Sequence, residues 1–346
     1  MKKRRILTVL SSLLIFMSAC GPKDYTGAYD LGVKSLKEND YNTALASFLK
    51  AKEDSELEVE SSRMIGITYL KMGDYKNAVT YLDDCRNKLR FKSEEFECDV
   101  MYYLAEACEG SGDTKRAIKL YSRLIKEHDD ADASFMRGRI YLGQNEEKKA
   151  KADFKASLAK NPGYDNYIRV YLIYAGNNRE ADGAAYLEET VKKEPRGAEE
   201  QYEQGRILYY LQDYDKASKV LKEAVDEGVD EAVWLLGQIY LKNQNQVSAR
   251  KLYQRYLDEN KDSAAAYNGL ALCDIADKNY DDALSDIQTG LEKADNKDKE
   301  NLLFNEIVVY ENKLDFKTAK EKMNVFVQQY PENETAVREN LFLQSR

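Results

Sequence analysis

A seven-residue phrase recurs along this chain and constrains its fold more than any other feature. It reads MGDYKNA at residues 72–78. Close relatives of it stand at residues 38–44, 111–117, 211–217, 277–283 and 313–319. Aligning on the small residue that ends the phrase gives nine positions spaced 32 to 39 residues apart: Ala44, Ala78, Ala117, Ala150, Gly183, Ala217, Ala249, Ala283 and Ala319. Such a period accommodates two helices of three to four turns with two turns between them, so it predicts a stack of nine repeats.

The residues around 72–78 predict a turn between two antiparallel helices. A helical pattern ends before Gly73, which can take the left-handed conformation that closes a helix. Asp74 is then suited to cap the start of the next helix, and Tyr75 to pack across the turn. Ala78 and Leu82, four residues apart, share one face of that second helix.

The pattern resembles the tetratricopeptide repeat, and the resemblance covers residues 25–333. The small residue of the family's first helix is found at Gly32, Gly66, Ala105, Gly138, Gly205, Gly237 and Ala271. The large residue of its second helix is found at Phe48, Leu82, Tyr121, Phe154, Leu187, Leu221, Tyr253, Ile287 and Met323. The resemblance implies an all-α fold, an α-solenoid of about nine helix-turn-helix repeats with a C-terminal capping helix at 334–346. The repeats are expected to start near residues 25, 59, 98, 131, 164, 198, 230, 264 and 300.

Two places depart from the family pattern. The fifth repeat has Tyr171 at the small position and Gly183 in place of the Ala, so its helices are expected to pack less tightly. The insertion at residues 85–100 is expected to lengthen both neighbouring helices.

The N-terminus reads as a targeting segment. Lys2, Lys3, Arg4 and Arg5 precede an apolar run that is too short to span a bilayer but suits a signal peptide. The residues Met-Ser-Ala-Cys at 17–20 resemble the lipobox of bacterial lipoproteins. That resemblance implies a signal peptide at 1–19, lipidation of Cys20, a tether at 20–24, and an extracytoplasmic protein anchored to a bacterial membrane. Ordinary secretion with cleavage after residue 19 is the alternative.

Charge and residue types exclude several classes of function. Residues 1–19 carry four basic and no acidic residues, so their removal changes the formal net charge from −9 to −13. This acidity argues against nucleic acid as a partner, since phosphate binding needs clustered Lys and Arg. Cys85, Cys98 and Cys108 form no C-x-x-C pair, and either a disulfide among them or burial on helix faces remains open.

No pattern of residues predicts an enzyme, a cofactor or a metal site. The single histidine, His128, is expected to be a solvated loop residue. Acidic pairs such as Asp83–Asp84, Asp129–Asp130 and Asp281–Asp282 are expected to be solvated charge at helix ends and turns, because carboxylate catalysis would need them buried opposite one another.

The first helix of each repeat is expected to line a binding groove. The positions three residues before and one residue after the small residue face that groove. Aromatic and Arg side chains, which often carry interface energy, are frequent there. The groove residues predicted to bind a partner are Tyr102, Phe135, Arg139, Tyr202, Arg206, Trp234 and Gln238.

These observations favour a non-catalytic, membrane-anchored scaffold or adaptor that binds a protein or peptide partner, with a possible setting in cell-envelope assembly. The carboxylate clamp of chaperone-binding members of the family is not found at the corresponding positions. A segment with apolar and basic residues therefore suits the groove better than an acidic tail. A receptor for a small ligand or glycan, with the same aromatic residues as stacking platforms, is the alternative. A hydrolase or assembly subunit that is active only in a complex is a third, and it would need a buried carboxylate with a perturbed pKa.

Overall fold

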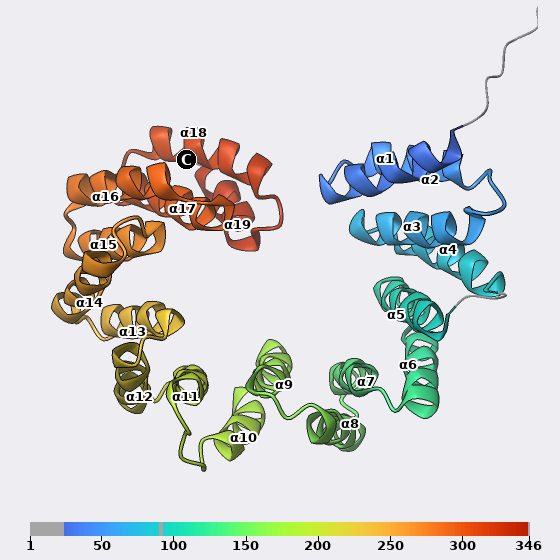
Figure 1. Ribbon diagram of the computed structural model, residues 1–346, viewed down its shortest axis with the longest axis horizontal. Coiled ribbons are helices and arrows are strands. Elements are labelled where there is room, and N and C mark those ends of the chain that lie inside the picture. The colour runs from blue at the N-terminus through green and yellow to red at the C-terminus, as the bar shows by residue number, and fades with distance from the viewer. Residues whose placement is uncertain (1–23, 90–92, 345–346) are drawn as a thin grey trace, which may run out of the picture. The chain divides into compact units, whose positions relative to one another are not determined.

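The computed structural model describes residues 24–89 and 93–344, and within them the chain is all helical. Nineteen helices hold 81% of these residues, and no strand occurs among them. The predicted all-α solenoid of paired helices is confirmed (Figure 1). The chain divides into two compact bodies, an N-terminal body that ends at Asn161 and a C-terminal body that begins at Pro162.

The N-terminal body contains the first four helix pairs, each made of two helices joined by a short turn. Its helices are α1 (Tyr25–Lys37), α2 (Tyr41–Ala51), α3 (Glu58–Lys71), α4 (Tyr75–Asn87), α5 (Glu94–Gly110), α6 (Thr114–His128), α7 (Ala131–Gly143) and α8 (Glu147–Lys160). The insertion lengthens α5 to 17 residues, whereas α4 keeps an ordinary 13. The expectation that both helices lengthen is therefore wrong for α4.

The C-terminal body contains five further helix pairs and one more helix. Its helices are α9 (Tyr164–Gly176), α10 (Glu180–Thr190), α11 (Ala198–Tyr210), α12 (Tyr214–Asp226), α13 (Asp230–Lys242), α14 (Gln246–Glu259), α15 (Ala264–Asp277), α16 (Tyr280–Lys293), α17 (Asn296–Asn312), α18 (Phe316–Gln329) and α19 (Glu334–Gln344). The last helix, α19, packs on α18 through Ala336 and Leu343, which are both buried. It covers apolar surface of the ninth pair, the place expected of a capping helix.

The recurrent phrase forms the turn inside each pair. Gly73 has φ +73°, and its counterparts in the other eight repeats are also left-handed: Asn39, Gly112, Asn145, Asn178, Gln212, Gln244, Lys278 and Leu314. The next residue caps the second helix in six repeats. Asp74, for example, accepts a hydrogen bond from the backbone N–H of Asn77 at 3.2 Å. The predicted conformation of Gly73 and the predicted cap are both confirmed.

The two helices of a repeat pack closely because a large side chain of the second helix fills the space beside a small residue of the first. A Cβ built on Gly66 of α3 would lie 2.5 Å from Cγ of Leu82 in α4. A Cβ on Gly32 would lie 2.6 Å from the ring of Phe48 in the same way. The small residue of the first helix therefore admits the large residue of the second, and the spacing between these two positions keeps each repeat in register.

The fifth repeat reaches close packing through a smaller residue at the Ala position of its second helix. A Cβ built on Gly183 of α10 would lie 2.8 Å from Cβ of Tyr174 and 3.1 Å from the carbonyl oxygen of Tyr171 in α9. The glycine is on the second helix here, and it brings α10 against the backbone of α9. The expectation of looser packing is therefore wrong at Gly183, because the missing side chain compensates for the large Tyr171.

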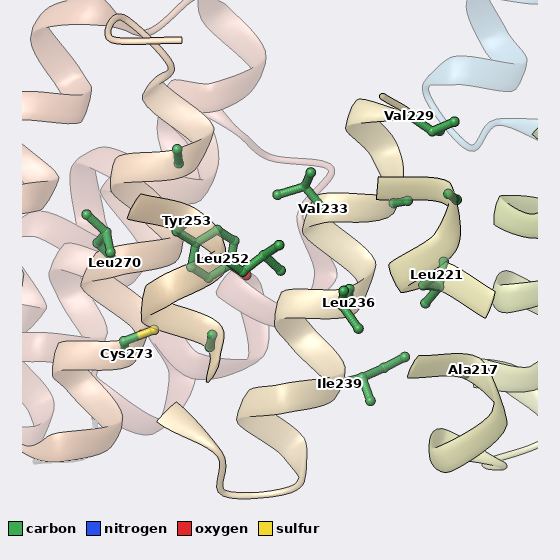
Figure 2. Close-up of a cluster of buried hydrophobic side chains, with 14 of the residues drawn as sticks. Ala217, Leu221, Val229, Val233, Leu236, Ile239, Leu252, Tyr253, Leu270 and Cys273 are labelled. Carbon is green, nitrogen blue, oxygen red and sulfur yellow. The ribbon is translucent and has the colours of Figure 1, made fainter. Parts of the chain in front are cut away.

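Within each body, buried side chains form apolar layers between consecutive helices. Figure 2 shows one of them in the C-terminal body, where Leu221 of α12, Leu236 of α13 and Tyr253 of α14 belong to the same cluster. Within each of the two bodies, neighbouring repeats bury apolar faces against one another, as expected for a solenoid.

Several of the acidic pairs tie neighbouring repeats together. Asp84 of α4 accepts a hydrogen bond from Lys52, in the preceding repeat, at 2.6 Å. Its neighbour Asp83 is paired with Arg116 of the following repeat. Burial acts to raise the pKa of Asp84, but hydrogen bonds from Lys52 and Lys88 outweigh it and lower the pKa to about 2. The expectation of solvated charge is wrong for Asp83 and Asp84, which are partly buried ion-pair members.

Candidate functional site

A groove lies between the first helices of two adjacent repeats in the C-terminal body, α11 and α13. Its volume is about 310 Å³. Four of the seven residues predicted to bind a partner line it: Tyr202, Arg206, Trp234 and Gln238. The structure thus brings together residues that are up to 36 positions apart in sequence, because equivalent positions of successive repeats face the same side.

Trp234 is held in place by two aromatic rings of α14. Its ring meets Tyr256 edge to face, with centroids 5.0 Å apart, and is stacked on Tyr253 at 6.1 Å. Trp234 is half-buried, so part of the indole remains accessible in the groove. This packing fixes the ring before any ligand arrives, which lowers the entropy lost on binding.

Arg206 is engaged by neighbouring carboxylates. Its guanidinium donates to Asp165 of α9 at 2.7 Å and to Glu203, one turn earlier, at 2.8 Å. It also lies over the ring of Tyr202, 5.7 Å from the centroid. Two carboxylates therefore offset its single charge, and Arg206 contributes no net positive potential to the groove.

The polar groups of the groove sit in a partly desolvated, acidic environment. Burial raises the pKa of Glu203, while Arg206 opposes that rise. Burial also raises the pKa of the Tyr202 hydroxyl, and the negative charges of Glu203, Glu231 and Asp165 raise it further. Three carboxylates and one guanidinium therefore act on the Tyr202 hydroxyl.

The other three predicted residues lie in the N-terminal body, and their side chains are used within it. Phe135 is 5% exposed and packs on Phe154 of its own repeat, with ring centroids 5.8 Å apart. The prediction of Phe135 as a groove residue is therefore wrong, because its ring is buried between the two helices of its own repeat. The other two form polar contacts with neighbouring helices.

Tyr102 donates a hydrogen bond to Asp130 at 2.6 Å, and burial together with this bond raises the pKa of its hydroxyl. Arg139 donates to Glu109 at 2.6 Å. Both contacts join α5 to the start or the body of α7, so they support packing between repeats.

Four lining residues were missed from the sequence: Tyr209, Tyr210, Glu231 and Leu235. Helical spacing could have found them. Glu231 lies three residues before Trp234, and Tyr210 lies four residues after Arg206, so each pair shares a helix face.

The histidine and the cysteines outside the groove contact or are buried among other residues of the protein. His128 ends α6, and its Nδ1 donates to Glu94 at 2.7 Å, so the expectation of a solvated loop residue is wrong. Burial raises the pKa of Cys108 to about 11 and that of Cys273 to about 12, which keeps both thiols protonated at neutral pH. None of the four cysteines in the described part of the chain is in a disulfide.

Asp286 and Asp274 form a carboxylate pair in which one pKa is strongly raised. Burial raises the pKa of Asp286 in α16 to about 6, and the neighbouring Asp274 of α15 adds to the effect. Asp274 is 4% exposed and accepts a hydrogen bond from Arg250 of α14 at 2.8 Å. The pair thus joins three consecutive helices.

Across residues 24–89 and 93–344, no group of three or more His, Cys, Asp or Glu side chains is placed to hold a metal ion. No helix in these ranges is long and apolar enough to cross a membrane. The predicted lipidation site, Cys20, and the signal peptide lie outside the described residues.

Comparison with known proteins gives one family. The tetratricopeptide repeat model matches residues 100–165, 172–227, 202–264 and 248–299, more than half of the chain, and a second model of the same repeat matches 64–85. Tetratricopeptide repeat protein 29 of Macaca fascicularis is 27% identical over 142 residues, which are 37% of this chain and 30% of that protein. The chain thus covers less than a third of this curated relative.

Two solved structures illustrate the likeness in fold. A tetratricopeptide repeat protein from Parabacteroides merdae ATCC 43184 is 15% identical, with 83% of this chain and 99% of that chain covered and a TM-score of 0.43. YrrB, described as a TPR protein with an unusual peptide-binding site, is 18% identical, with 63% and 96% covered and a TM-score of 0.33. The matched family is a scaffold repeat rather than a catalytic domain. With nine helix pairs of matching pattern and family matches over more than half of its length, this chain belongs to the tetratricopeptide repeat family.

Proposed function

We propose that this protein is a non-catalytic adaptor that holds a peptide segment of a protein partner in the groove between α11 and α13. The observation that carries the proposal is the lining of that groove. Tyr202, Tyr209, Tyr210 and Trp234 supply four aromatic side chains, with Leu235 between the helices and the polar ends of Arg206, Glu231 and Gln238 around them. Trp, Tyr and Arg are the residues that most often carry binding energy at protein interfaces.

The form of the groove suits an extended segment better than an enclosed ligand. It lies along two neighbouring first helices, and its side chains come from three successive turns of α11. Tyr202 and Trp234 are already fixed by contacts within the protein, so few side chains need to be ordered on binding. These features support a protein or peptide partner.

The experiment is a crosslinking pull-down that compares the native chain with the double variant Tyr202→Ala/Trp234→Ala. The double variant Tyr41→Ala/Tyr75→Ala is the matched control, since it removes two partly exposed rings from the N-terminal body. We expect a protein that is enriched by the native chain and by the control but lost with the groove variant. Equal capture by all three proteins would refute the assignment of the groove.

A second groove variant guards against loss of folding. Trp234 packs on Tyr253 and Tyr256, so its removal also destabilises α14 contacts. Glu231 and Gln238 are exposed and line the same groove, so Glu231→Gln/Gln238→Ala should leave the fold intact while weakening capture. Far-UV circular dichroism of each variant checks the helix content.

We further propose that the protein is held at the outer side of a bacterial membrane by lipid on Cys20 and works in cell-envelope assembly. The basic and apolar residues before Cys20 support this address. Since the chain without residues 1–19 would carry a net charge of −13, acyl chains rather than basic residues would hold it at an anionic surface. Cys20→Ala should abolish incorporation of labelled fatty acid and release the protein to the soluble fraction; continued membrane association would contradict the proposal.

A receptor for a small ligand or glycan remains the rival function, because the same rings could stack on a sugar. The groove volume of about 310 Å³ is at the lower end of pockets that enclose small molecules. Saturable binding of a soluble glycan, lost in Tyr202→Ala/Trp234→Ala, would favour this rival.

A further inference from the structure

We propose that the segment bound between α11 and α13 is basic: an extended peptide that places an Arg or Lys side chain against Trp234 and Tyr202 beside Glu231, with an adjacent apolar residue on Leu235. This inference rests on the proposed function of the same groove and adds the chemistry of the partner. It is carried by the balance of charge around the groove and by the kind of surface that the groove offers.

The charged groups around Tyr202 are predominantly acidic, while Lys242 lies over the ring of Tyr209, 5.5 Å from its centroid. Asp165, Glu203 and Glu231 lie around Tyr202, and all three act on its hydroxyl as negative charges. Arg206 is the opposing charge there, and its two short hydrogen bonds to Asp165 and Glu203 already use it. Within the described part of the chain, Glu231 has no ion pair, which leaves one carboxylate available to an incoming cation.

The fixed position of Arg206 disfavours an acidic partner. A carboxylate that approached this guanidinium would have to displace Asp165 or Glu203, and the displaced carboxylate would then remain partly buried. Burial raises the pKa of Glu203, and the pairing with Arg206 opposes that rise. Breaking a partly buried ion pair costs more than the pair contributes when intact.

The aromatic surface suits a cation in its own right. The face of Tyr202 already binds one guanidinium, that of Arg206, at 5.7 Å from the ring centroid. Trp234 is the aromatic residue with the strongest attraction for cations, and its half-buried ring lies on the opposite wall of the groove. An Arg or Lys side chain could cover these rings with its apolar stem while its charged end reaches Glu231.

The test uses the full chain, whose single tryptophan is Trp234, so intrinsic fluorescence reports on this groove directly. Three N-acetylated hexapeptide amides are titrated: Leu alternating with Arg, Leu alternating with citrulline, and Leu alternating with Glu. Citrulline keeps the size and hydrogen-bonding shape of Arg without its charge. We expect the Arg peptide to bind about two- to tenfold more tightly than the citrulline peptide, and the Glu peptide to bind most weakly.

Variants assign the effect to the groove. Glu231→Gln should weaken the Arg peptide about two- to fivefold and leave the citrulline peptide unchanged. Glu292→Gln, an equal change of charge at an exposed position of α16, should alter neither. Titration calorimetry should show that the variant Tyr202→Ala/Trp234→Ala no longer binds either the Arg peptide or the citrulline peptide.

Each other outcome overturns the inference. Equal affinity for the Arg and citrulline peptides, tighter binding of the Glu peptide, or no binding of any peptide would show that the groove does not select a basic segment. Equal weakening of Arg-peptide binding by Glu231→Gln and Glu292→Gln would show attraction to the acidic protein as a whole. Spermidine that binds as tightly as the Arg peptide would show that a peptide is not required. A partner captured through Tyr202 and Trp234 would still support the adaptor function in all of these cases.

Discussion

Replacing Gly183 by Ala tests the packing of the fifth repeat, because the repeat pattern and the structure predict opposite effects. Eight of the nine repeats have Ala at this position, and Ala in a helix interior is about 0.5–1 kcal/mol more favourable than Gly. The pattern alone therefore predicts that Gly183→Ala stabilises the protein. The structure predicts destabilisation.

The magnitude follows from the neighbours of the added methyl group. It would lie 2.8 Å from Cβ of Tyr174, and 3.1 Å and 3.2 Å from the carbonyl oxygen and Cα of Tyr171. These atoms belong to the backbone of α9 or adjoin it, so α9 and α10 must separate. Overpacking of this kind costs about 1–3 kcal/mol, which exceeds the gain in helix propensity. We expect a net loss of about 1 kcal/mol or more in the free energy of unfolding.

Urea unfolding followed by far-UV circular dichroism and by Trp234 fluorescence measures this change. Gly176→Ala is the matched control, since Gly176 ends α9 and has no neighbouring atom within 4 Å of an added Cβ. This control should be neutral or stabilising by about 0.5 kcal/mol. If Gly183→Ala is as stable as the native chain or more so, the close approach of α10 to α9 is refuted.

Three further perturbations test the turns and the buried carboxylate. Leu314 is 72% exposed and has φ +60°, a left-handed conformation that is unfavourable for Leu. Leu314→Gly should therefore stabilise the protein by about 1 kcal/mol in urea unfolding, and an unchanged midpoint would contradict strain at this residue. Asp74→Ala removes a helix cap and should cost about 1 kcal/mol, whereas Asp74→Asn should retain most of the stability; equal losses would mean that the cap is unimportant. The pKa of Asp286 is raised from 3.8 to about 6, so the folded state binds its proton more tightly than the unfolded state does, and this contribution to stability is present below pH 4 and lost as pH rises through 6. Asp286→Asn should flatten that decline in thermal unfolding between pH 4 and 7, and an unchanged slope would exclude Asp286 as its source.

The fold could be predicted from the sequence because its determinants are local. The left-handed residue, the cap and the small and large residues all lie within one repeat, and nine copies make the pattern unmistakable. Tyr202, Arg206, Trp234 and Gln238 could be placed together for the same reason, since equivalent positions of adjacent repeats share a face.

The rest of the site depends on the exposure and contacts of individual side chains, which the repeat pattern does not specify. Phe135 and Trp234 occupy equivalent positions, and each packs on the large residue of its second helix, yet Phe135 is 5% exposed whereas Trp234 is only half-buried. The pairing of Arg206 with Asp165, 41 residues away, depends on side-chain directions in the folded state. The close packing at Gly183 could not be foreseen either, because the compensating contact is made by backbone atoms of α9.

The close contact between Tyr171 and Gly183 in the fifth repeat also bears on how such a chain can be rearranged by recombination. Repeats that fit a large side chain of the second helix over a small residue of the first can exchange halves without a clash, as Gly66 with Leu82 and Gly32 with Phe48 illustrate. A crossover inside the fifth repeat would set Tyr171 against an Ala from another copy, or leave Gly183 facing a small residue across a void. We therefore expect duplication of a whole repeat to preserve these contacts, and a crossover inside the fifth repeat to disturb them.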